Sequence, residues 1–307
     1  MRMCIRLFLV IKMKNTIFFF LFFFGCTFPH SFMNNNKNTF DWQGHRGCRG
    51  LLPENSIPAF LKALEFPMIT TLELDVAVSK DGQLVISHDP YFEAEFSSKP
   101  DGTPVTKEEE LSLNIHKMTY EEVKQYDGGK RGHPRFPEQQ AMAVYKPTFR
   151  AMVEAVEKQC RMTNRTLIHY NIEIKSRPSW DGIYTPDSET FVRLVLKEIK
   201  DLGIEKRCCI QSFDPRPLNI LHQLNKKITN ALLVENTHGV AENLAHLNYK
   251  PLIYSPYFKF VSPKMLDSCH QQGIKVIPWT VNDVADMKEL KAMGVDGIIT
   301  DYPNRAF

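Results

Sequence analysis

Short apolar runs rich in β-branched and aromatic residues recur along the chain. Such runs, bounded by Gly, Pro, Asn or Asp, predict β-strands. We expect strands over residues 40–45, 71–78, 84–88, 167–175, 207–213, 230–234, 251–255, 275–280 and 297–300. Segments between many of these runs repeat apolar residues at helical spacing instead. They predict amphipathic helices over residues 56–66, 148–160, 188–202, 215–224, 263–272 and 283–293.

Alternation of strands and helices over the length of the chain indicates a parallel sheet covered by helices. Without its first 25 residues the chain has the length of one α/β barrel or of two small domains. A closed (β/α)8 barrel, or TIM barrel, and an open doubly wound sheet both fit this α/β pattern. Eight strands complete such a barrel, whereas the sequence offers nine candidates.

One tight turn accounts for the additional strand. Residues 78–83 read Val-Ser-Lys-Asp-Gly-Gln, a short polar turn between two predicted strands. Parallel neighbours need a crossover of roughly a dozen residues, whereas antiparallel neighbours need only a turn. We therefore expect an irregular hairpin after the second strand, inside an otherwise ordinary barrel.

Residues 90–147 interrupt the alternation. They are dense in Pro, Gly and charged residues, and they contain one short helical pattern at residues 119–123. A loop of this length inside a compact domain is usually functional. Because the insertion follows directly on His88 and Asp89, we interpret it as a lid on the substrate side. A tolerated surface insertion is the alternative.

The first 25 residues predict an export signal rather than part of the fold. Four basic residues and no acidic one precede an uncharged, Phe-rich stretch that is short for a membrane span. Gly25 and Cys26 close this stretch in the manner of a bacterial lipobox, which predicts cleavage before Cys26 and acylation of its sulfur. Cleavage a few residues later and a retained N-terminal anchor are the alternatives.

After this signal we expect a flexible, Asn-rich tether over residues 26–39 and the barrel domain over residues 40–307. The protein is then exported to the periplasmic or cell-surface side and anchored to a membrane through Cys26. Removal of residues 1–25 takes away four basic residues, so the net charge of +3 falls to about −1. Without a basic stripe, the sequence excludes nucleic acid as a partner.

Alternation within two of the predicted strands directs acidic side chains to one face. Glu73 and Asp75 alternate with leucine and valine, and Glu173 alternates with isoleucines. A barrel strand is apolar on its helix-covered side, so the three carboxylates should point toward the barrel axis. A divalent cation with oxygen ligands, such as Mg, Ca or Mn, would neutralise them. A salt-bridge cluster with Lys175 and Arg46 is the alternative.

Two histidines also lie at strand ends, His45 after the first strand and His88 after the hairpin. Active sites of TIM barrels are built at the carboxyl ends of the strands. Histidines beside carboxylates suit general acid–base catalysis, because the imidazole pKa is close to working pH. Arg46 and Lys175 add positive charge for phosphate oxygens. Together these residues indicate phosphoryl-group chemistry.

An ordered set of short motifs closely resembles the glycerophosphodiester phosphodiesterase family, which is related to the phosphatidylinositol phospholipases C. No single motif is decisive, but the set follows the order of the family from residue 43 to about residue 305. The motifs are His45-Arg46-Gly47, Pro53-Glu54-Asn55-Ser56, Glu73-Leu74-Asp75-Val76, His88-Asp89, Asn171-Ile172-Glu173-Ile174-Lys175, Gln211-Ser212-Phe213, Trp279-Thr280-Val281-Asn282 and the run from Gly294 to Pro303. Ser56 stands where the family more often has Thr.

The resemblance implies a (β/α)8 barrel that uses one divalent cation, Ca or Mg. By position it implies that Glu73, Asp75 and Glu173 are the metal ligands. His45 and His88 correspond to the catalytic pair of the family. The implied reaction is the hydrolysis of a small-molecule glycerophosphodiester to sn-glycerol 3-phosphate and an alcohol, with one histidine as base and the other as acid.

Further residues match supporting positions. Arg46 and Lys175 correspond to bases that contact phosphate, and Trp279 corresponds to an aromatic residue that packs against substrate. Glu54 and Asn55 lie in the signature turn, and we expect Glu54 near the metal or hydrogen-bonded to a ligand or histidine.

Two other functions remain compatible with the same residues. A lysophospholipase D acting on lysolipids would use the same metal ligands and histidines, and the Phe-rich insertion and the predicted anchor suit it. A barrel that binds ligands without catalysis is the second alternative. The insertion over residues 90–147 matches the family poorly, so the alcohol that is released stays open.

Overall fold

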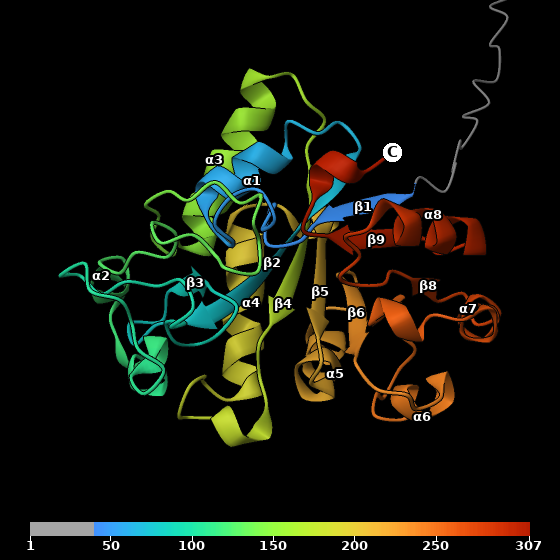
Figure 1. Cartoon of the computed structure of the whole chain (residues 1–307). Coiled ribbons are helices and arrows are strands. Elements are labelled where there is room, and N and C mark those ends of the chain that lie inside the picture. The colour runs from blue at the N-terminus through green and yellow to red at the C-terminus, as the bar shows by residue number, and fades with distance from the viewer. Residues whose placement is uncertain (1–39) are drawn as a thin grey trace, which may run out of the picture. The chain divides into compact units, whose positions relative to one another are not determined.

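Eight parallel strands wind around a common axis, with helices on their outer side (Figure 1). The computed structural model describes residues 40–307. The strands are β1 (Asp41–Gly44), β2 (Ile69–Val78), β3 (Leu84–Ile86), β4 (His169–Ile174), β5 (Cys208–Ser212), β6 (Thr229–Val234), β7 (Ile253–Pro256), β8 (Lys275–Val276) and β9 (Gly297–Thr300). Their order is β8-β7-β6-β5-β4-β2-β1-β9, with β3 paired to β2. The predicted TIM barrel is therefore confirmed.

The barrel is nearly closed between its last two strands. β8 ends at Val276, earlier than the predicted 280, because Pro278 has no N–H to donate to a ladder. Backbone hydrogen bonds continue across this seam, from Ile299 N to Pro278 O (3.0 Å) and from Val281 N to Ile299 O (2.9 Å). β1 pairs in parallel with β9, which excludes the open doubly wound sheet.

β2 and β3 form the predicted hairpin. They pair antiparallel, with Val76 opposite Ile86 and Val78 opposite Leu84. The connecting turn contains Gly82 at a φ of +76°, a backbone conformation that glycine adopts without steric cost. The hairpin places His88 at the carboxyl end of the barrel.

The helices are α1 (Ile57–Ala63), α2 (Tyr120–Val123), α3 (Phe149–Met162), α4 (Ser188–Asp201), α5 (Pro215–Leu224), α6 (Val240–Leu244), α7 (Pro263–His270) and α8 (Val284–Met293). The N-cap of α3 is Thr148, whose hydroxyl accepts a hydrogen bond from Ala151 N. The sequence did not predict α6, because five residues are too few to show a helical period.

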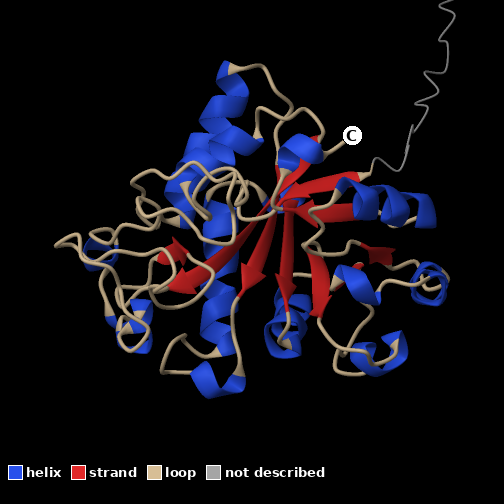
Figure 2. Ribbon diagram, in the orientation of Figure 1, coloured by secondary structure: helices blue, strands red, loops and turns tan. Residues whose placement is uncertain are grey.

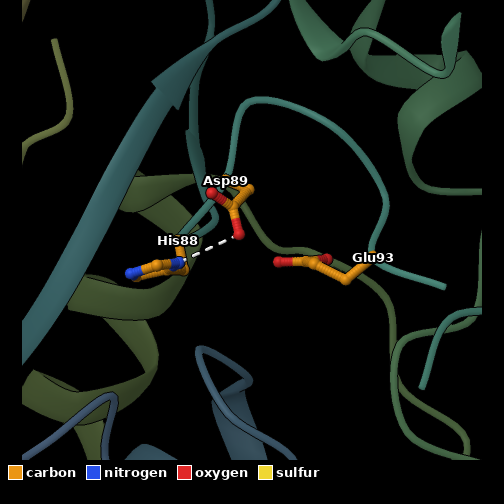
Figure 3. A group of neighbouring side chains, drawn as sticks. All are labelled: His88, Asp89 and Glu93. Carbon is orange, nitrogen blue, oxygen red and sulfur yellow. Dashed lines mark hydrogen bonds and ion pairs between the residues drawn. The ribbon is translucent and has the colours of Figure 1, made fainter. Parts of the chain in front are cut away.

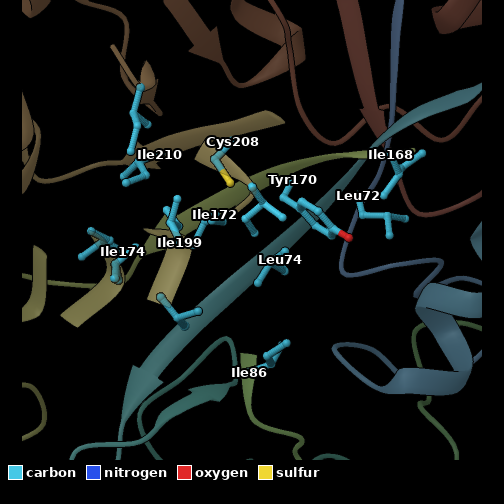
Figure 4. Close-up of a cluster of buried hydrophobic side chains, with 14 of the residues drawn as sticks. Leu72, Leu74, Ile86, Ile168, Tyr170, Ile172, Ile174, Ile199, Cys208 and Ile210 are labelled. Atoms are coloured by element: carbon cyan, nitrogen blue, oxygen red, sulfur yellow. The ribbon is translucent and has the colours of Figure 1, made fainter. Parts of the chain in front are cut away.

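The main hydrophobic core lies between the strands and the helices. Apolar residues of β2 and β4 alternate along each strand and face the helices, together with neighbours on β5 and α4 (Figure 4). The labelled residues of this cluster are Leu72, Leu74, Ile86, Ile168, Tyr170, Ile172, Ile174, Ile199, Cys208 and Ile210. The intervening residues of β2 and β4 therefore point to the barrel axis, as the alternation predicted.

Residues 90–147 form a compact insertion with an apolar core of its own. Phe92, Val105, Ile115 and Val123 are buried against Ala77 and Val85 of the hairpin. Figure 2 shows most of this segment as loop beside β2 and β3. Its packing on the hairpin fixes it next to the strand ends that carry the candidate site.

Two of the N-terminal predictions cannot be compared with the structure. The export signal over residues 1–25 and the tether over residues 26–39, Cys26 included, lie outside the described residues. Within residues 40–307, no helix combines the length and apolar character needed to cross a bilayer. The five cysteines of that part of the chain are free thiols.

Candidate active site

The turn after β1 brings hydrogen-bond donors to the carboxylates of Glu73 and Asp75. Arg46 has a φ of +49° and Gly47 a φ of +82°. A Cβ at Gly47 would lie 2.8 Å from the backbone of α1 at Ala59, so only glycine fits this turn. The same turn aims the backbone N–H of Arg46 at Glu73 Oε2, at 2.9 Å. The predicted signature turn adds Asn55, whose Nδ2 donates to Asp75 Oδ2 (2.9 Å).

Three buried carboxylates meet at the carboxyl ends of β2 and β4. One oxygen from each of Glu73, Asp75 and Glu173 lies within 4.8 Å of the others. Gln211 Nε2 donates to the second oxygen of Glu73 at 2.9 Å. Asp75 Oδ1 is buried and has no hydrogen-bond partner within the described residues; Lys175 Nζ is 3.6 Å away.

The three carboxyl groups are too close to ionise independently. Burial, together with repulsion from Asp75 and Glu173, raises the pKa of Glu73 well above its ordinary value. Burial also raises the pKa of Glu173 to about 7, although Lys175 opposes the rise. For Asp75 burial is outweighed by Arg46 and Lys175, so its pKa is well below the ordinary value. The cluster therefore has a deficit of positive charge.

The structure supports both ways of neutralising the three carboxylates that the sequence predicted, namely ion pairs with Lys175 and Arg46 and a bound divalent cation. The ion-pair alternative is present, because Lys175 Nζ lies 2.9 Å from Glu173 Oε1 and Arg46 Nε lies 3.3 Å from Asp75 Oδ2. These two cations still leave Asp75 Oδ1 without a hydrogen bond, with Lys175 Nζ 3.6 Å away, and they leave the pKa of Glu73 raised. A set of oxygen donors with one unsatisfied buried atom fits a divalent cation.

Two histidines flank the carboxylates, each held by an acidic residue. His45 Nδ1 lies 2.6 Å from Asp301 Oδ1, and His88 Nδ1 lies 3.0 Å from Asp89 Oδ2 (Figure 3). A carboxylate at Nδ1 assigns the proton to that nitrogen, so Nε2 is the basic nitrogen of each ring. In His88 it accepts a hydrogen bond from Lys175 Nζ at 2.8 Å. His45 Nε2 is 3.9 Å from Glu73 Oε2.

The environment keeps both imidazoles neutral near pH 7. Burial lowers the pKa of His45 to about 4, against the opposing effect of Asp301. Burial is the largest cause that lowers the pKa of His88 to about 4, and the positive charges of Arg46 and Lys175 add to it. Two neutral imidazoles beside an acidic cluster can remove or deliver protons within one site.

Sequence comparison assigns the family. The glycerophosphoryl diester phosphodiesterase family matches residues 45–305. The chain belongs to this family. Curated relatives named glycerophosphodiester phosphodiesterase include those of Caldanaerobacter subterraneus subsp. tengcongensis, 30% identical over 84% of this chain and 93% of the relative, and of Bacillus altitudinis, 30% identical over 85% and 94%. The chain is therefore an enzyme, a glycerophosphodiester phosphodiesterase.

Solved structures agree on the fold. A glycerophosphoryl diester phosphodiesterase structure from Silicibacter pomeroyi has a TM-score of 0.77 at 25% identity and covers 87% of this chain and 92% of its own. An Oleispira antarctica phosphodiesterase, solved with the product sn-glycerol-3-phosphate, has a TM-score of 0.68 at 22% identity and covers 87% and 94%. Both support the nearly closed (β/α)8 barrel.

Most of the site residues expected from the resemblance line one cavity of about 870 Å³. They are His45, Arg46, Glu73, His88, Glu173, Lys175 and Trp279. Asp75 and Asn55 lie beside it in contact with Arg46 and with each other. Glu54 accepts a hydrogen bond from Arg46 Nη1 at 2.7 Å, so it contacts Arg46 rather than a histidine. Trp279 is held by its Nε1, which donates to Ser255 O at 2.9 Å.

Asp301 is the site residue that the sequence reasoning missed. It lies directly after β9 and accepts hydrogen bonds from His45, from Arg49 Nε at 2.9 Å and from Asn282 Nδ2 at 2.8 Å. Burial opposes its ionisation, but Arg49 and His45 hold the pKa of Asp301 well below the ordinary value. Its position at a strand end, within a family motif, was the available signal.

Proposed function

We propose that the enzyme hydrolyses glycerophosphodiesters to sn-glycerol 3-phosphate and an alcohol, with His45 and His88 transferring the protons. The observation that carries this proposal is the pair of imidazoles beside a buried three-carboxylate cluster. His45 Nε2 lies 3.9 Å from Glu73 Oε2, and His88 Nε2 accepts a hydrogen bond from Lys175 Nζ (2.8 Å), which itself contacts Glu173. The product bound to the Oleispira phosphodiesterase supports the same product here. We further propose that Glu73, Asp75 and Glu173 hold one Ca or Mg ion.

The position of each side chain in the site suggests a different role in the reaction. Arg46 and Lys175 border the cavity and supply positive charge to the phosphate oxygens. One histidine takes a proton from the attacking oxygen, and the other protonates the alkoxide as its bond to phosphorus breaks. Attack by water gives glycerol 3-phosphate directly, whereas attack by the glycerol 2-hydroxyl gives a cyclic phosphate that a water molecule must then open, with the roles of the histidines reversed. A divalent cation, when bound, supplies a Lewis acid for phosphate oxygens. Trp279 forms an aromatic wall for the substrate.

The identity of the products tests this proposal. We expect glycerophosphocholine to give glycerol 3-phosphate and choline, measured by a coupled glycerol 3-phosphate assay and by 31P NMR. Release of phosphocholine would mean that the other ester bond breaks. Hydrolysis of lysophosphatidylcholine without hydrolysis of glycerophosphocholine would favour the lysophospholipase D alternative.

We also propose that Asp301 positions His45 by accepting its Nδ1–H. Asn in place of Asp301 keeps the size of the side chain but removes the negative charge opposite the ring, so kcat should fall by roughly 100-fold or more with KM little changed. The acidic limb of the pH profile should move to lower pH, because a positively charged His45 loses its stabilising carboxylate. Unchanged kcat and pH profile in the folded variant would reduce Asp301 to a structural role.

The N-terminal export signal and Cys26 remain a proposal based on the sequence alone. We propose that the enzyme is exported to the periplasmic or cell-surface side and is anchored to a membrane by acylation of Cys26. Ser in place of Cys26 should move the enzyme from the membrane fraction to the soluble exported fraction. Membrane association that does not change in this variant would contradict acylation at that residue.

A further inference from the structure

Three buried amide side chains lie inside the barrel, beside the carboxylates of the candidate site. Gln43, Asn171 and Gln211 come from β1, β4 and β5, and each is between 1% and 3% exposed. The residue before each of them packs in the outer hydrophobic core, so all three point to the barrel axis. Buried amides are costly unless they are hydrogen-bonded, so their partners indicate what they support.

The three amides form one continuous chain of hydrogen bonds. Asn171 Nδ2 donates to Gln43 Oε1 and to Gln211 Oε1, each at 2.8 Å. At one end, Gln43 Nε2 donates to Asp41 Oδ2 at 2.7 Å. At the other end, Gln211 Nε2 donates to Glu73 Oε1 at 2.9 Å. The chain therefore connects the amino end of β1 to a carboxylate of the candidate cation site.

The two ends of this chain fix the orientation of every amide in it. Both ends are carboxylates, and an ionised carboxylate accepts hydrogen bonds without donating any. Each glutamine must therefore turn its NH2 group to a carboxylate and its oxygen to Asn171. Asn171 donates both of its hydrogens as a result, and its Oδ1 is left buried without a hydrogen-bond partner among residues 40–307.

Stability of the barrel does not account for these amides. On the opposite side, the interior from β6 to β9 is filled by apolar side chains, those of Ala231, Ile253, Ile277 and Ile299. Replacement of both partners of a buried hydrogen bond by apolar groups of the same shape is nearly neutral or stabilising. An apolar filling would therefore serve the fold equally well beside β1, β4 and β5, and it would remove the unpartnered oxygen of Asn171.

Glu73 is the residue at which the chain meets the candidate cation site. Its Oε1 accepts from Gln211, and its Oε2 accepts from the backbone N–H of Arg46 at 2.9 Å. Two donors on different oxygens fix the plane of the carboxylate, and each oxygen keeps a lone pair for a cation. Without the donor on Gln211, the carboxylate could turn away from Asp75 and Glu173, whose oxygens of like charge lie within 4.8 Å.

We propose that Gln211 is a positioning residue, which holds Glu73 in the orientation that binds the cation. Asn171 and Gln43 in turn hold Gln211 in the orientation that donates. The inference rests on the proposed cation site and adds residues that act through one of its ligands. Hydrogen-bond partners of metal ligands contribute roughly 10- to 100-fold to metal affinity or activity.

Gln211→Met tests the inference, because methionine has a similar length but no hydrogen to donate. We expect the Kd for Ca or Mg, measured by isothermal titration calorimetry on cation-stripped enzyme, to rise by roughly tenfold or more. At saturating cation, kcat and KM for glycerophosphocholine should return to within about threefold of the unsubstituted values, since the substitution acts through cation binding. A direct contact between Gln211 and substrate would instead raise KM at every cation concentration.

Two further variants keep the test decisive. Asn171→Leu changes a residue outside the cavity lining, so it can reach the cation only through its neighbours. It should also raise the Kd, and it decides the matter if Gln211→Met does not fold. Asn243→Leu is the matched control, because Asn243 is another buried amide, 6% exposed, whose Nδ2 donates to Tyr254 Oη at 2.9 Å. It should lower the melting temperature and leave the Kd unchanged.

The outcomes separate the inference from the proposed function. An unchanged Kd in the folded Gln211 or Asn171 variant would overturn the inference and leave the cation site intact. A loss of kcat or a raised KM that saturating cation does not restore would overturn it as well. Unsubstituted enzyme that binds neither Ca nor Mg would overturn the cation site and the inference together.

Discussion

Alanine in place of His45 or His88 is expected to lower the turnover of glycerophosphocholine by roughly 100- to 10,000-fold. Each ring has its Nδ1 held by a carboxylate, which leaves Nε2 as the basic nitrogen; in His88 this atom accepts a hydrogen bond from Lys175 Nζ at 2.8 Å. Removal of either ring takes away one of the two proton transfers that the hydrolysis needs. Steady-state kcat, measured with a bound-metal check on each variant, gives the comparison.

The fold should survive both substitutions. Asp301 keeps its hydrogen bonds from Arg49 and Asn282 when His45 is removed, and circular dichroism should be unchanged. Ala in place of His238, a histidine whose side chain is 56% exposed and far along the chain, is the matched control and should retain full turnover. Near-normal turnover in either site variant would exclude that histidine from the mechanism.

Gln in place of Glu73 is expected to separate stability from activity. One oxygen of Glu73 lies within 4.8 Å of oxygens of two other carboxyl groups, and burial together with repulsion from Asp75 and Glu173 raises the pKa of Glu73 well above its ordinary value. A neutral Gln removes this repulsion. The free energy of unfolding of the metal-free protein should therefore stay within about 1 kcal/mol or increase. Turnover should fall by roughly 100-fold or more, because one of the three cation-binding carboxylates is lost.

Thermal unfolding with and without Ca or Mg measures this effect. The unsubstituted enzyme should gain in melting temperature when the cation is added, because a ligand that binds the folded state stabilises it. The Glu73→Gln variant should lose most of that gain. Glu65→Gln, at a side chain 62% exposed, is the control and should behave as the unsubstituted enzyme. An unchanged cation-dependent gain in the Glu73 variant would contradict its role as a ligand.

Much of the barrel could be predicted because two of its signals are local: the alternation of apolar and polar residues along a strand, and the length of the turn between two strands. Alternation in β2 and β4 placed Glu73, Asp75 and Glu173 on the inner face, where the structure has them. The pattern of strands and helices did not by itself distinguish a closed barrel from an open sheet; the family resemblance made that choice. Closure depends on β1 pairing with β9, a contact between the two ends of the domain that leaves no periodic signal.

The features that the sequence analysis missed depend on contacts between residues that are far apart in the chain or irregularly spaced. Asp301 binds His45 across 256 positions of the chain, so only the closed barrel brings the two together. The insertion packs Phe92, Val105 and Ile115 at irregular spacing, which hides its apolar core from any search for helical or strand periods. Lys146, its buried tie to Glu93 and Ser87, could not be distinguished from a surface lysine.

The most direct test of the account measures glycerol 3-phosphate release from glycerophosphocholine and glycerophosphoethanolamine by the purified enzyme. The assay is run as isolated, after EDTA treatment, and after Ca or Mg is restored. We predict release from both diesters, loss of release with EDTA, and recovery with one or both cations. Release that continues undiminished in EDTA would contradict cation-dependent hydrolysis. Folded, cation-loaded enzyme that releases no glycerol 3-phosphate would contradict the proposed reaction itself.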